Sequence, residues 1–380
     1  MIQFHIIRKC LFLLLLSLIQ VSSVYAFGDN CDWLKNIPED SLRTLATSAG
    51  LPIGNAVNVN ALNEDEIYKQ ILAEQFSSVT AENAMKWSEV EPVQGEYNWA
   101  PADELVAFAQ ENKQLVRGHV LVWHNQLPTW LEEGYNNGDI TNEEMEEILH
   151  QHVIDEVTHF KGKIWHWDVV NEAFEEDGSL RDTIWLQALG KDYIAKTFSW
   201  AHEADPKAKL YYNDYNLGYI GAKSDAAYKL LQELIADGVP IHGVGFQGHM
   251  GMQYGMWYDM VENMRRFAKL GLEIALTEVD VRILLLSEDI PEQEAQLLWQ
   301  DKLMGQAHMF THALQACLAV KQCVSFTVWG LSDAHSWVPD VFPEEGAATL
   351  YDENYEPKPA YKAVQQTLSI SRGTSVRRPW

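Results

Sequence analysis

Long apolar segments and domain linkers are missing from most of this 380-residue sequence. Beyond residue 26 no stretch is long and apolar enough to cross a bilayer, so we expect no membrane-spanning helix. Beyond residue 27 there is also no Gly/Ser linker, proline-rich hinge or low-complexity tract of the kind that separates domains. These absences predict a single domain at residues 27–368, followed by a C-terminal tail at residues 369–380 that we expect to be disordered.

Basic residues are scarce. The sequence has 28 Lys and Arg against 54 Asp and Glu, which gives a formal net charge of −26. Such an acidic surface repels nucleic acid and anionic membranes, so we expect neither as a partner. The same charge is no obstacle to a neutral substrate.

Cysteine is rare as well. Four are present, and none forms with histidine a cluster that has the spacing of zinc ligands, so no zinc site is expected. Cys317 and Cys323 are six residues apart and could close a short loop in an oxidising compartment. Cys31, near the N-terminus of the chain, is left without an assigned partner by this pairing. It is either a free thiol or an interchain partner, and the sequence leaves both open.

The one strongly apolar run lies at the N-terminus. Arg8 and Lys9 precede an apolar core at Cys10–Ile19, and Val24-Tyr25-Ala26 has the small-residue pattern of a cleavage site. The apolar core is too short to span a bilayer, which favours a secretory signal peptide at residues 1–26 over a membrane anchor. We therefore expect a secreted protein, either extracellular or periplasmic.

Short β-like runs alternate with longer helical patterns along the rest of the chain. The runs predicted as strands are Ile53–Val57, Ser78–Ala81, Leu115–Leu121, Ile164–Val170, Lys209–Asn213, Gly243–Gln247, Glu273–Thr277 and Ser325–Trp329. The predicted helices include Asp65–Phe76, Asp103–Asn112, Glu143–Phe160, Ala222–Ala236, Trp257–Leu270, Glu292–Leu318 and Pro359–Leu368. Several strands are apolar on both faces, as expected for parallel strands that helices cover.

The pattern of units predicts the fold class. Thr141-Asn142-Glu143-Glu144 has the spacing of a capping box, and Asp237-Gly238 supplies a helix stop. Eight strand–helix units in about 330 residues predict an α/β fold, a single-domain (β/α)8 TIM barrel, with its active site at the C-terminal ends of the strands. A doubly wound open sheet is the alternative, but no glycine-rich phosphate-binding loop follows the first strand.

Polar and aromatic side chains follow the predicted strands at equivalent positions. In strand order they are Glu82, Asn83, Lys86 and Trp87, then His119, Trp123 and His124, then Asn171 and Glu172, then Asn213 and Asp214, then Gln247 and His249, then Glu278 and Asp280, then Trp329. Because the strand ends of a barrel meet around one opening, these side chains are predicted to form one site.

Glu172 and Glu278 are the central pair of this predicted site. Each follows an almost wholly apolar strand, where a carboxylate must be paired, hydrogen-bonded or kept neutral because burial of its charge is costly. Two glutamates three strands apart face each other across a barrel mouth. Glycosidic cleavage needs such a pair, with an acid for the leaving oxygen and a second carboxylate. The distance between them decides between retention and inversion, and the sequence leaves it open.

Five segments together resemble glycoside hydrolase family 10. In chain order they are Gly118–His124 (GHVLVWH), Trp167–Ala173 (WDVVNEA), Gly243–His249 (GVGFQGH), Thr277–Asp280 (TEVD) and Thr327–Gly330 (TVWG). The resemblance extends from about Ala56 to Tyr361, and the motifs are specific in combination. It implies a (β/α)8 barrel and an endo-β-1,4-xylanase that cleaves xylan with retention.

The resemblance also implies a role for each matched residue. Glu172 is expected to be the acid/base and Glu278 the nucleophile. His249 and Asp280 are expected to hydrogen-bond around the nucleophile, and Asn171 to hold the sugar 2-hydroxyl. The residues expected to bind xylose hydroxyls on the glycone side are Glu82, Asn83, Lys86, His119 and Gln247. Those expected to form the aromatic walls of the cleft are Trp123, Trp329 and Trp337. Gln126, with Trp123, is expected to exclude a hydroxymethyl group and so favour xylose over glucose.

The remaining expectations concern the disulfide, the partners and the alternatives. The resemblance implies a Cys317–Cys323 disulfide before the eighth strand, whereas the loop Ser332–Thr349 around Trp337 is less typical of the family. The implied partner is xylan or a xylo-oligosaccharide, acted on by a monomer without metal or cofactor. Two alternatives remain, a retaining barrel glycosidase acting on cellulose or mannan and a non-catalytic carbohydrate-binding protein.

Overall fold

The computed structural model of the protein describes residues 37–287 and 289–371. The predicted signal peptide and Cys31 lie outside these residues, as does the predicted tail beyond residue 371. The first two residues of that tail, Ser369 and Ile370, belong to the last helix.

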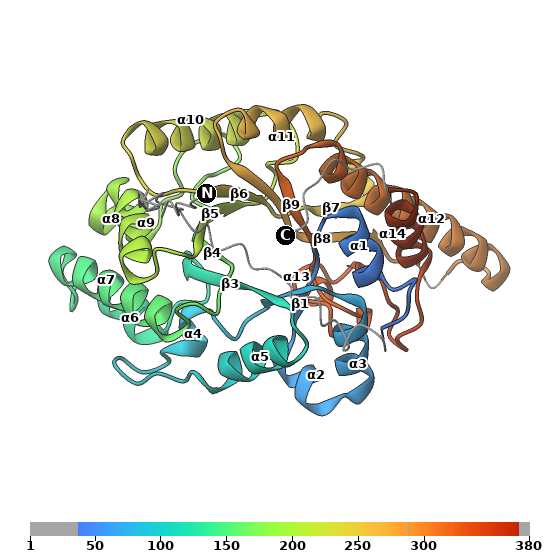
Figure 1. The fold of residues 1–380 in the computed structure, drawn as a ribbon, viewed down its shortest axis with the longest axis horizontal. Helices are drawn as coiled ribbons and strands as arrows, with labels where there is room; N and C mark the ends of the chain where they lie inside the picture. The colour runs from blue at the N-terminus through green and yellow to red at the C-terminus, as the bar shows by residue number, and fades with distance from the viewer. Residues whose placement is uncertain (1–36, 288, 372–380) are drawn as a thin grey trace, which may run out of the picture.

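Eight parallel strands form a closed barrel (Figure 1). They are β1 (Ile53–Val57), β2 (Ser78–Ala81), β3 (Leu115–Val122), β4 (His166–Asn171), β5 (Lys209–Asp214), β6 (Gly243–Phe246), β8 (Glu273–Leu284) and β9 (Cys323–Val328). Each barrel strand pairs in parallel with the next, and β9 pairs with both β8 and β1, so the sheet closes on itself. The predicted (β/α)8 barrel is confirmed.

Helices surround the barrel (Figure 1). Those that follow the barrel strands in turn are α3 (Glu66–Gln75), α5 (Ala100–Glu111), α7 (Asn142–His159), α9 (Asp192–Ala204), α10 (Ala222–Ala236), α11 (Met260–Ala268), α12 (Glu292–Ala319) and α14 (Pro359–Ile370). Helix α1 (Leu42–Ala49) precedes the barrel. The shorter helical segments are α2 (Val59–Glu64), α4 (Trp87–Val90), α6 (Thr129–Asn136), α8 (Ile184–Leu189), η2 (Met252–Tyr254), η3 (Asp333–His335) and α13 (Val338–Val341).

The barrel strands are buried on both faces. Every residue of β1 and β4 is buried, as expected when helices cover one face and opposing side chains fill the other. Gly118 of β3 shows how close this packing is, because a Cβ atom placed on it would lie 2.2 Å from the ring of Trp167 on β4. The glycine of the GHVLVWH segment therefore makes room for a fully buried tryptophan of the WDVVNEA segment.

Strand β8 is longer than predicted. The sequence predicts a strand over Glu273–Thr277, whereas β8 continues to Leu284 because its second half pairs with β7 (His249–Gly251) and β10 (Glu345–Gly346). The pairing with β7 places His249 opposite Asp280. The extension of β8 thus positions two of the predicted site residues beside each other.

The helix signals of the sequence correspond to real helix ends. Thr141 and Glu144 form the predicted capping box at the start of α7, where Thr141 Oγ1 accepts a hydrogen bond from Glu144 N at 3.2 Å. Gly238 follows α10 with a φ of 76°, a conformation that glycine adopts without strain. The prediction omitted α9 between β4 and β5, and it placed the ends of α11 too far out, at Trp257 and Leu270.

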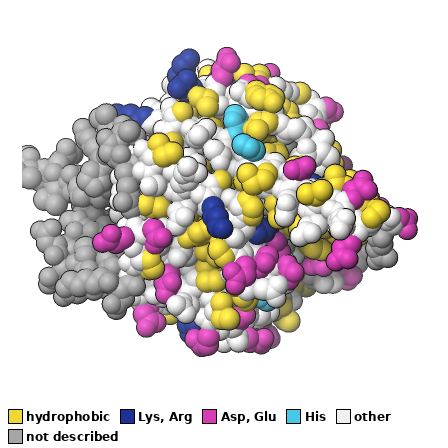
Figure 2. Space-filling view, turned by 90° about the vertical axis from the view of Figure 1, so that its right-hand side faces the viewer, with side chains coloured by type: hydrophobic (Ala, Val, Ile, Leu, Met, Phe, Trp, Pro, Cys, Tyr) yellow, Lys and Arg dark blue, Asp and Glu magenta, His cyan; other side chains and the backbone are white. Residues whose placement is uncertain are grey.

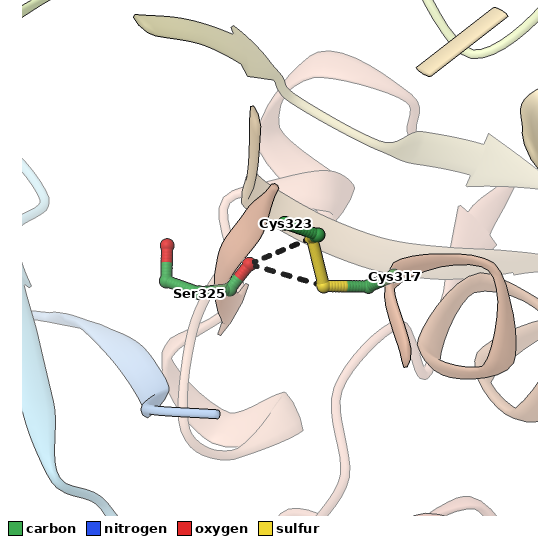
Figure 3. The surroundings of a disulfide bond; sticks show 3 residues. All are labelled: Cys317, Cys323 and Ser325. Atoms are coloured by element: carbon green, nitrogen blue, oxygen red, sulfur yellow. Dashed lines mark hydrogen bonds between the residues drawn. A yellow bond between two sulfur atoms is a disulfide. The ribbon is translucent and has the colours of Figure 1, made fainter. Parts of the chain in front are cut away.

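The predicted disulfide is present. Cys317, in the last turn of α12, is bonded to Cys323, the first residue of β9, beside Ser325 (Figure 3). Both cysteines are buried. The bond therefore ties the long helix α12 to the barrel strand that follows it.

Acidic side chains are scattered over one face of the molecule (Figure 2). Figure 2 shows acidic side chains spread among hydrophobic ones, with few basic side chains, on the face that lies to the right in Figure 1. Among the helices of residues 37–287 and 289–371, none is long and apolar enough to span a membrane.

Candidate active site

The C-terminal ends of the barrel strands bring the predicted site residues together at one opening. Those joined to one another by hydrogen bonds are Asn83, Lys86, Trp123, Gln126, Asn171, Glu172, Gln247, His249, Glu278, Asp280 and Trp337. The other three, Glu82, His119 and Trp329, lie beside them through charge or ring contacts.

Glu278, on β8, is buried and accepts hydrogen bonds from two other elements. Asn213 Nδ2 donates to its Oε1 at 2.6 Å, and His249 Nε2 donates to its Oε2 at 3.1 Å. On the other side of the imidazole ring, His249 Nδ1 donates to Asp280 Oδ2 at 2.8 Å. Because both ring nitrogens face carboxylates, the imidazole carries two protons and a positive charge.

The charges of this trio set its protonation. Burial lowers the pKa of His249, but Asp280 and Glu278 raise it by more, to about 10. Burial raises the pKa of Glu278, but the hydrogen bond from His249 and the electrostatic influence of His119 and His249 lower it by more, to about 2. The carboxylate of Glu278 is therefore ionised at neutral pH, the state in which it can attack a carbon centre.

Glu172 directly follows β4, and its carboxylate accepts three N–H groups. Trp123 Nε1 donates to Oε2 at 2.9 Å. Gln247 Nε2 and Asn171 Nδ2 donate to Oε1 at 3.0 and 3.1 Å. The backbone of Glu172 is left-handed, with a φ of 58°, which is uncommon for a residue with a Cβ atom. Such conformations cluster at functional sites.

A chain of amides connects the surroundings of the two glutamates. Asn171 Oδ1 accepts hydrogen bonds from Asn213 Nδ2 at 2.8 Å and from Gln247 Nε2 at 3.1 Å. The same Asn213 amide donates to Glu278, and the same Gln247 amide donates to Glu172. The carboxyl groups of Glu172 and Glu278, which come from different strands, are thus connected through one hydrogen-bond network.

A second polar group follows β2. Lys86 is buried, and its Nζ donates to Gln126 Oε1 at 2.6 Å and to Asn83 Oδ1 at 3.0 Å. The same Nζ lies 4.9 Å from the centre of the Trp123 ring. Burial raises the pKa of the adjacent Glu82 to about 7, although Lys86 lowers it. Over the described ranges, Glu82 Oε2 is buried without a hydrogen-bond partner.

Aromatic rings complete the walls around Glu278. Trp329 lies edge-on to His119, with ring centres 5.2 Å apart. Trp337 lies edge-on to His249 at 5.0 Å and donates its Nε1–H to Asp280 Oδ2 at 2.8 Å. This hydrogen bond fixes Trp337 in the loop whose form the sequence left undefined.

His119 is oriented by a buried charged pair. Its Nδ1 lies 3.0 Å from Asp168 Oδ2, and Asp168 Oδ1 accepts a hydrogen bond from Arg117 at 2.6 Å. Ligand atoms of His119, Asp168 and Glu278 lie within 4.8 Å of one another, a spacing at which they could hold a metal ion. Arg117 already neutralises Asp168, and N–H donors already occupy Glu278, so these groups are matched to protein partners.

A hollow of about 910 Å³ adjoins the site on the side of His249. It is lined by the segments that follow β5 and β6 and by part of α11, with the aromatic residues Tyr219, Tyr254, Trp257 and Tyr258. Tyr254 and Tyr258 are 71% and 85% exposed, so their rings are available for contact with a ligand. The hollow therefore opens directly beside His249.

Three residues that complete the site were given no individual role from the sequence. Asn213 was predicted only as one of the strand-end residues, and in the structure it pairs in register with Asn171. Arg117 and Asp168 lie inside apolar strands, where a charged residue requires a partner. Their pairing depends on the register of β3 with β4, which the sequence did not provide.

Comparison with known proteins agrees with this geometry. Glycosyl hydrolase family 10 matches residues 41–367. Endo-1,4-beta-xylanase B of Thermotoga neapolitana is 38% identical over 355 residues, which are 93% of this chain and 96% of that protein. Endo-1,4-beta-xylanase 1 of Humicola insolens is 37% identical over 332 residues, 86% of this chain and 74% of that protein.

Solved structures give the same result. The crystal structure of xylanase 10B from Thermotoga petrophila RKU-1 in complex with xylobiose has a TM-score of 0.80 and 41% identity, and covers 87% of this chain and 97% of that one. Native xylanase 10B from Thermotoga maritima has a TM-score of 0.81 and 41% identity, and covers 88% and 100%. With its motifs in register around one barrel opening, the chain belongs to glycosyl hydrolase family 10.

Proposed function

We propose that this protein is an endo-β-1,4-xylanase that hydrolyses internal linkages of xylan with retention of configuration. Glu172 is the acid/base and Glu278 the nucleophile. The observation that carries the proposal is the hydrogen-bond geometry around the carboxylate of Glu278. His249 and Asn213 hold that carboxylate, and an amide network connects its surroundings to a second glutamate. The names of the relatives support xylan as the substrate.

The reaction takes two displacements. In the first, a carboxylate oxygen of Glu278 attacks the anomeric carbon, and Glu172 gives its proton to the leaving glycosidic oxygen as the C–O bond breaks. In the second, Glu172 takes a proton from water. The water oxygen attacks the same carbon, and the bond to Glu278 breaks. Two inversions at one carbon give net retention.

The residues around Glu278 support both steps. His249 keeps the attacking carboxylate ionised before the first step, and it stabilises the same carboxylate when it leaves in the second. Asp280 fixes the imidazole ring, because its Oδ2 accepts hydrogen bonds from both His249 Nδ1 and Trp337 Nε1. We assign to Asn171 the contact with the sugar 2-hydroxyl, which strengthens in the transition state.

The polar group after β2 is assigned to the glycone sugars. Lys86 presents a buried ammonium group, and Glu82 presents an oxygen ready to accept a hydroxyl proton. Asn83, His119 and Gln247 supply further polar atoms. Trp123, Trp329 and Trp337 provide flat apolar walls. Gln126, locked to Lys86 at 2.6 Å beside the Trp123 ring, occupies space that a hydroxymethyl group would need, which favours xylose over glucose.

Cleavage inside a chain requires sugar-binding surface on both sides of the scissile bond. The hollow beside His249 supplies such a surface on the other side of the two glutamates from the group after β2. Its exposed Tyr254 and Tyr258 rings suit contact with sugar faces. This arrangement favours an endo-acting enzyme over one that removes terminal sugars.

The proposal extends to the cellular setting. We infer that residues 1–26 direct secretion and that residues 27–368 are the catalytic domain, followed by a tail. The Cys317–Cys323 disulfide supports an oxidising compartment, either periplasmic or extracellular. We propose that the enzyme works as a monomer on xylan or xylo-oligosaccharides. With a net charge of −26, it should bind neither nucleic acid nor anionic membranes.

The deciding experiment measures reducing-sugar release from xylan, carboxymethyl-cellulose and mannan by wild type and by Glu278→Ala. Activity on xylan should be abolished in Glu278→Ala and kept in Glu292→Ala, a matched change at an exposed glutamate of α12. Added azide should let Glu278→Ala cleave an activated aryl xylobioside with inversion. Activity mainly on another glycan would retain the mechanism and replace the substrate. Activity on none would favour the carbohydrate-binding alternative.

A further inference from the structure

The backbone around Glu172 is held in a conformation that it would not adopt alone. A φ of 58° is disfavoured for a residue with a Cβ atom, because Cβ crowds the following carbonyl group. Such a conformation persists only where the surroundings impose it. The side chain of Glu172 starts from this backbone, so whatever fixes the backbone also fixes the direction of its carboxyl group.

Four hydrogen bonds fix three successive peptide groups at this position, and two of the four fall on the peptide between Glu172 and Ala173. Glu172 N donates to Asn213 O at 2.9 Å, and Glu172 O accepts from Arg181 Nε at 3.0 Å. Ala173 O accepts from Arg181 N at 2.8 Å, and Ala173 N donates to Tyr212 Oη at 3.2 Å. Two of these bonds come from side chains, and the sequence analysis gave neither of them a role.

The Tyr212 hydroxyl can serve Ala173 only as an acceptor. Tyr212 is fully buried on β5, and its hydroxyl donates its one proton to Asp214 Oδ2. Burial and the neighbouring Asp214 carboxylate raise the pKa of Tyr212, so the phenol keeps that proton at neutral pH. With its proton directed at Asp214, the oxygen is left to accept from Ala173 N.

A buried charged pair holds Tyr212 in turn. Asp214 Oδ1 accepts hydrogen bonds from Lys223 Nζ at 2.9 Å and from Tyr215 N at 2.9 Å. Asp214 and Lys223 are 0% and 2% exposed, so the pair is shielded from water. A chain of contacts therefore runs from Lys223 on α10 through Asp214 and Tyr212 to the peptide that follows Glu172.

We propose that Tyr212 and Arg181 are positioning residues for the acid/base, which hold the peptide between Glu172 and Ala173 and thereby aim the Glu172 carboxyl group at the glycosidic oxygen. Neither residue is assigned to touch the reacting atoms. This inference rests on the proposed function, because it concerns the proton that Glu172 delivers and later removes. The nucleophile Glu278 accepts its hydrogen bonds from the side chains of Asn213 and His249, so neither substitution removes one of them.

Leaving-group dependence tests the proposal. In Tyr212→Phe the ring stays and the acceptor of Ala173 N is lost. kcat/KM for linear xylo-oligosaccharides should then fall by about 10- to 100-fold, the size expected for a misaimed catalytic group. kcat/KM for 2,4-dinitrophenyl β-xylobioside should stay within about twofold of wild type, because its leaving group needs no proton. kcat on this substrate should fall, since the second step requires Glu172 as a base.

Tyr211→Phe is the matched control. Tyr211 is the preceding residue of β5, is equally buried, and donates its hydroxyl proton to Glu273 Oε2 at 2.8 Å, at the opposite end of the barrel. It should match wild type in both substrate classes. Arg181→Lys is the second variant. Arg181 is only half-buried, so its replacement should disturb folding less. We expect the same selective loss of kcat/KM on xylo-oligosaccharides as in Tyr212→Phe, but a smaller one.

The outcomes separate the two proposals. A loss of kcat/KM confined to xylo-oligosaccharides in Tyr212→Phe and Arg181→Lys supports the positioning role. An equal loss of kcat/KM on both substrates, or no loss on either, in folded variants overturns it and leaves the proposed function intact. A wild-type enzyme that cleaves neither substrate overturns the proposed function, and this inference with it.

Discussion

The carboxyl group of Glu172 accepts N–H groups from three side chains and stands at the end of β4. We assign to this carboxyl group the transfer of a proton to the glycosidic oxygen. Only a leaving group of high pKa needs that proton in order to depart. In Glu172→Ala we therefore expect kcat/KM on xylan to fall by roughly 10²- to 10⁴-fold, the usual size of general acid catalysis. The value for 2,4-dinitrophenyl β-xylobioside should be almost unchanged.

The measurement is a series of aryl xylobiosides with leaving groups of increasing pKa. For Glu172→Ala the plot of log(kcat/KM) against leaving-group pKa should be much steeper than for wild type. Glu203→Ala, a change at an exposed glutamate of α9, should keep the wild-type slope. An equal loss across the series would contradict the role as acid and indicate a role in binding.

The charge on His249 gives a second prediction at this scale. Its pKa is raised to about 10 and that of Glu278 is lowered to about 2, so the pair is ionised over the neutral range. Replacement by a neutral donor, His249→Gln, removes the positive charge beside Glu278. The pKa of Glu278 should then rise, because burial is no longer offset to the same extent.

The acidic limb of the pH profile of kcat/KM reports this pKa in the free enzyme. It should move to higher pH in His249→Gln, by roughly one to two units, the size expected from loss of an adjacent charge. His242→Gln, at a histidine near the other end of the barrel beside Lys209 and Glu273, serves as control and should leave the limb in place. An unmoved limb in His249→Gln would show that another group governs it.

At the residue scale, the sequence predicted most of the site residues that stand at strand ends. It did not predict the hydrogen bonds that connect these residues. Glu172, Glu278 and His249 could be identified because each follows a strand within a motif. Asn213, which bridges to both Asn171 and Glu278, acquires its role only from its contacts. A motif specifies residue types along the chain, whereas a hydrogen-bond network depends on side-chain geometry across several strands.

Close packing between neighbouring strands gives a prediction at the element scale. The added Cβ of Gly118→Ala would lie 2.2 Å from the Trp167 ring, and Trp167 is fully buried. Overpacking of this kind costs about 1–3 kcal/mol of the free energy of unfolding. Gly346→Ala, where the added Cβ meets its nearest neighbour at 3.4 Å, is the control. Thermal unfolding should show a lower Tm for Gly118→Ala alone. Equal Tm values would mean that the Trp167 ring can move aside.

Element boundaries show where sequence patterns end and tertiary pairing begins. The missed helix α9 buries Tyr193, Ile194, Phe198 and Ala201 at helical spacing, so its signal was present in the sequence. The second half of β8 gave no such signal, because Asp280 and Arg282 interrupt the apolar pattern. It is a strand because β7 and β10 pair with it. Local pattern thus suffices for most helices and barrel strands, and pairing partners decide the rest.

Closure of the barrel is the whole-molecule event on which the site depends. The pairing of β1 with β9 and of β8 with β9 brings the polar group after β2 to the same opening as Glu278. The sequence predicted this closure only through the count of strand–helix units. The disulfide at the start of β9 then fastens α12 to the strand that completes the ring.

The charge of the whole molecule distinguishes neutral from acidic substrates. The formal net charge is −26, and acidic side chains are scattered over the face shown in Figure 2. Salt shortens the range of this charge, from about 30 Å at 0.01 M to about 8 Å at 0.15 M. For a neutral linear xylo-oligosaccharide, kcat/KM should therefore change by less than about twofold over that range, because no long-range attraction or repulsion is screened.

A xylo-oligosaccharide with a glucuronate branch provides the comparison. Its carboxylate is repelled by the acidic protein at low salt, so its kcat/KM should rise as salt is added. The two substrates share the same backbone, and only the charge differs, so their ratio cancels any general effect of salt on the enzyme. If the ratio of the two kcat/KM values stayed constant with salt, the net charge of the protein would have no effect on a substrate that enters the barrel opening. In that case the buried ions Lys86, His249 and Arg117 would dominate the field that the substrate meets.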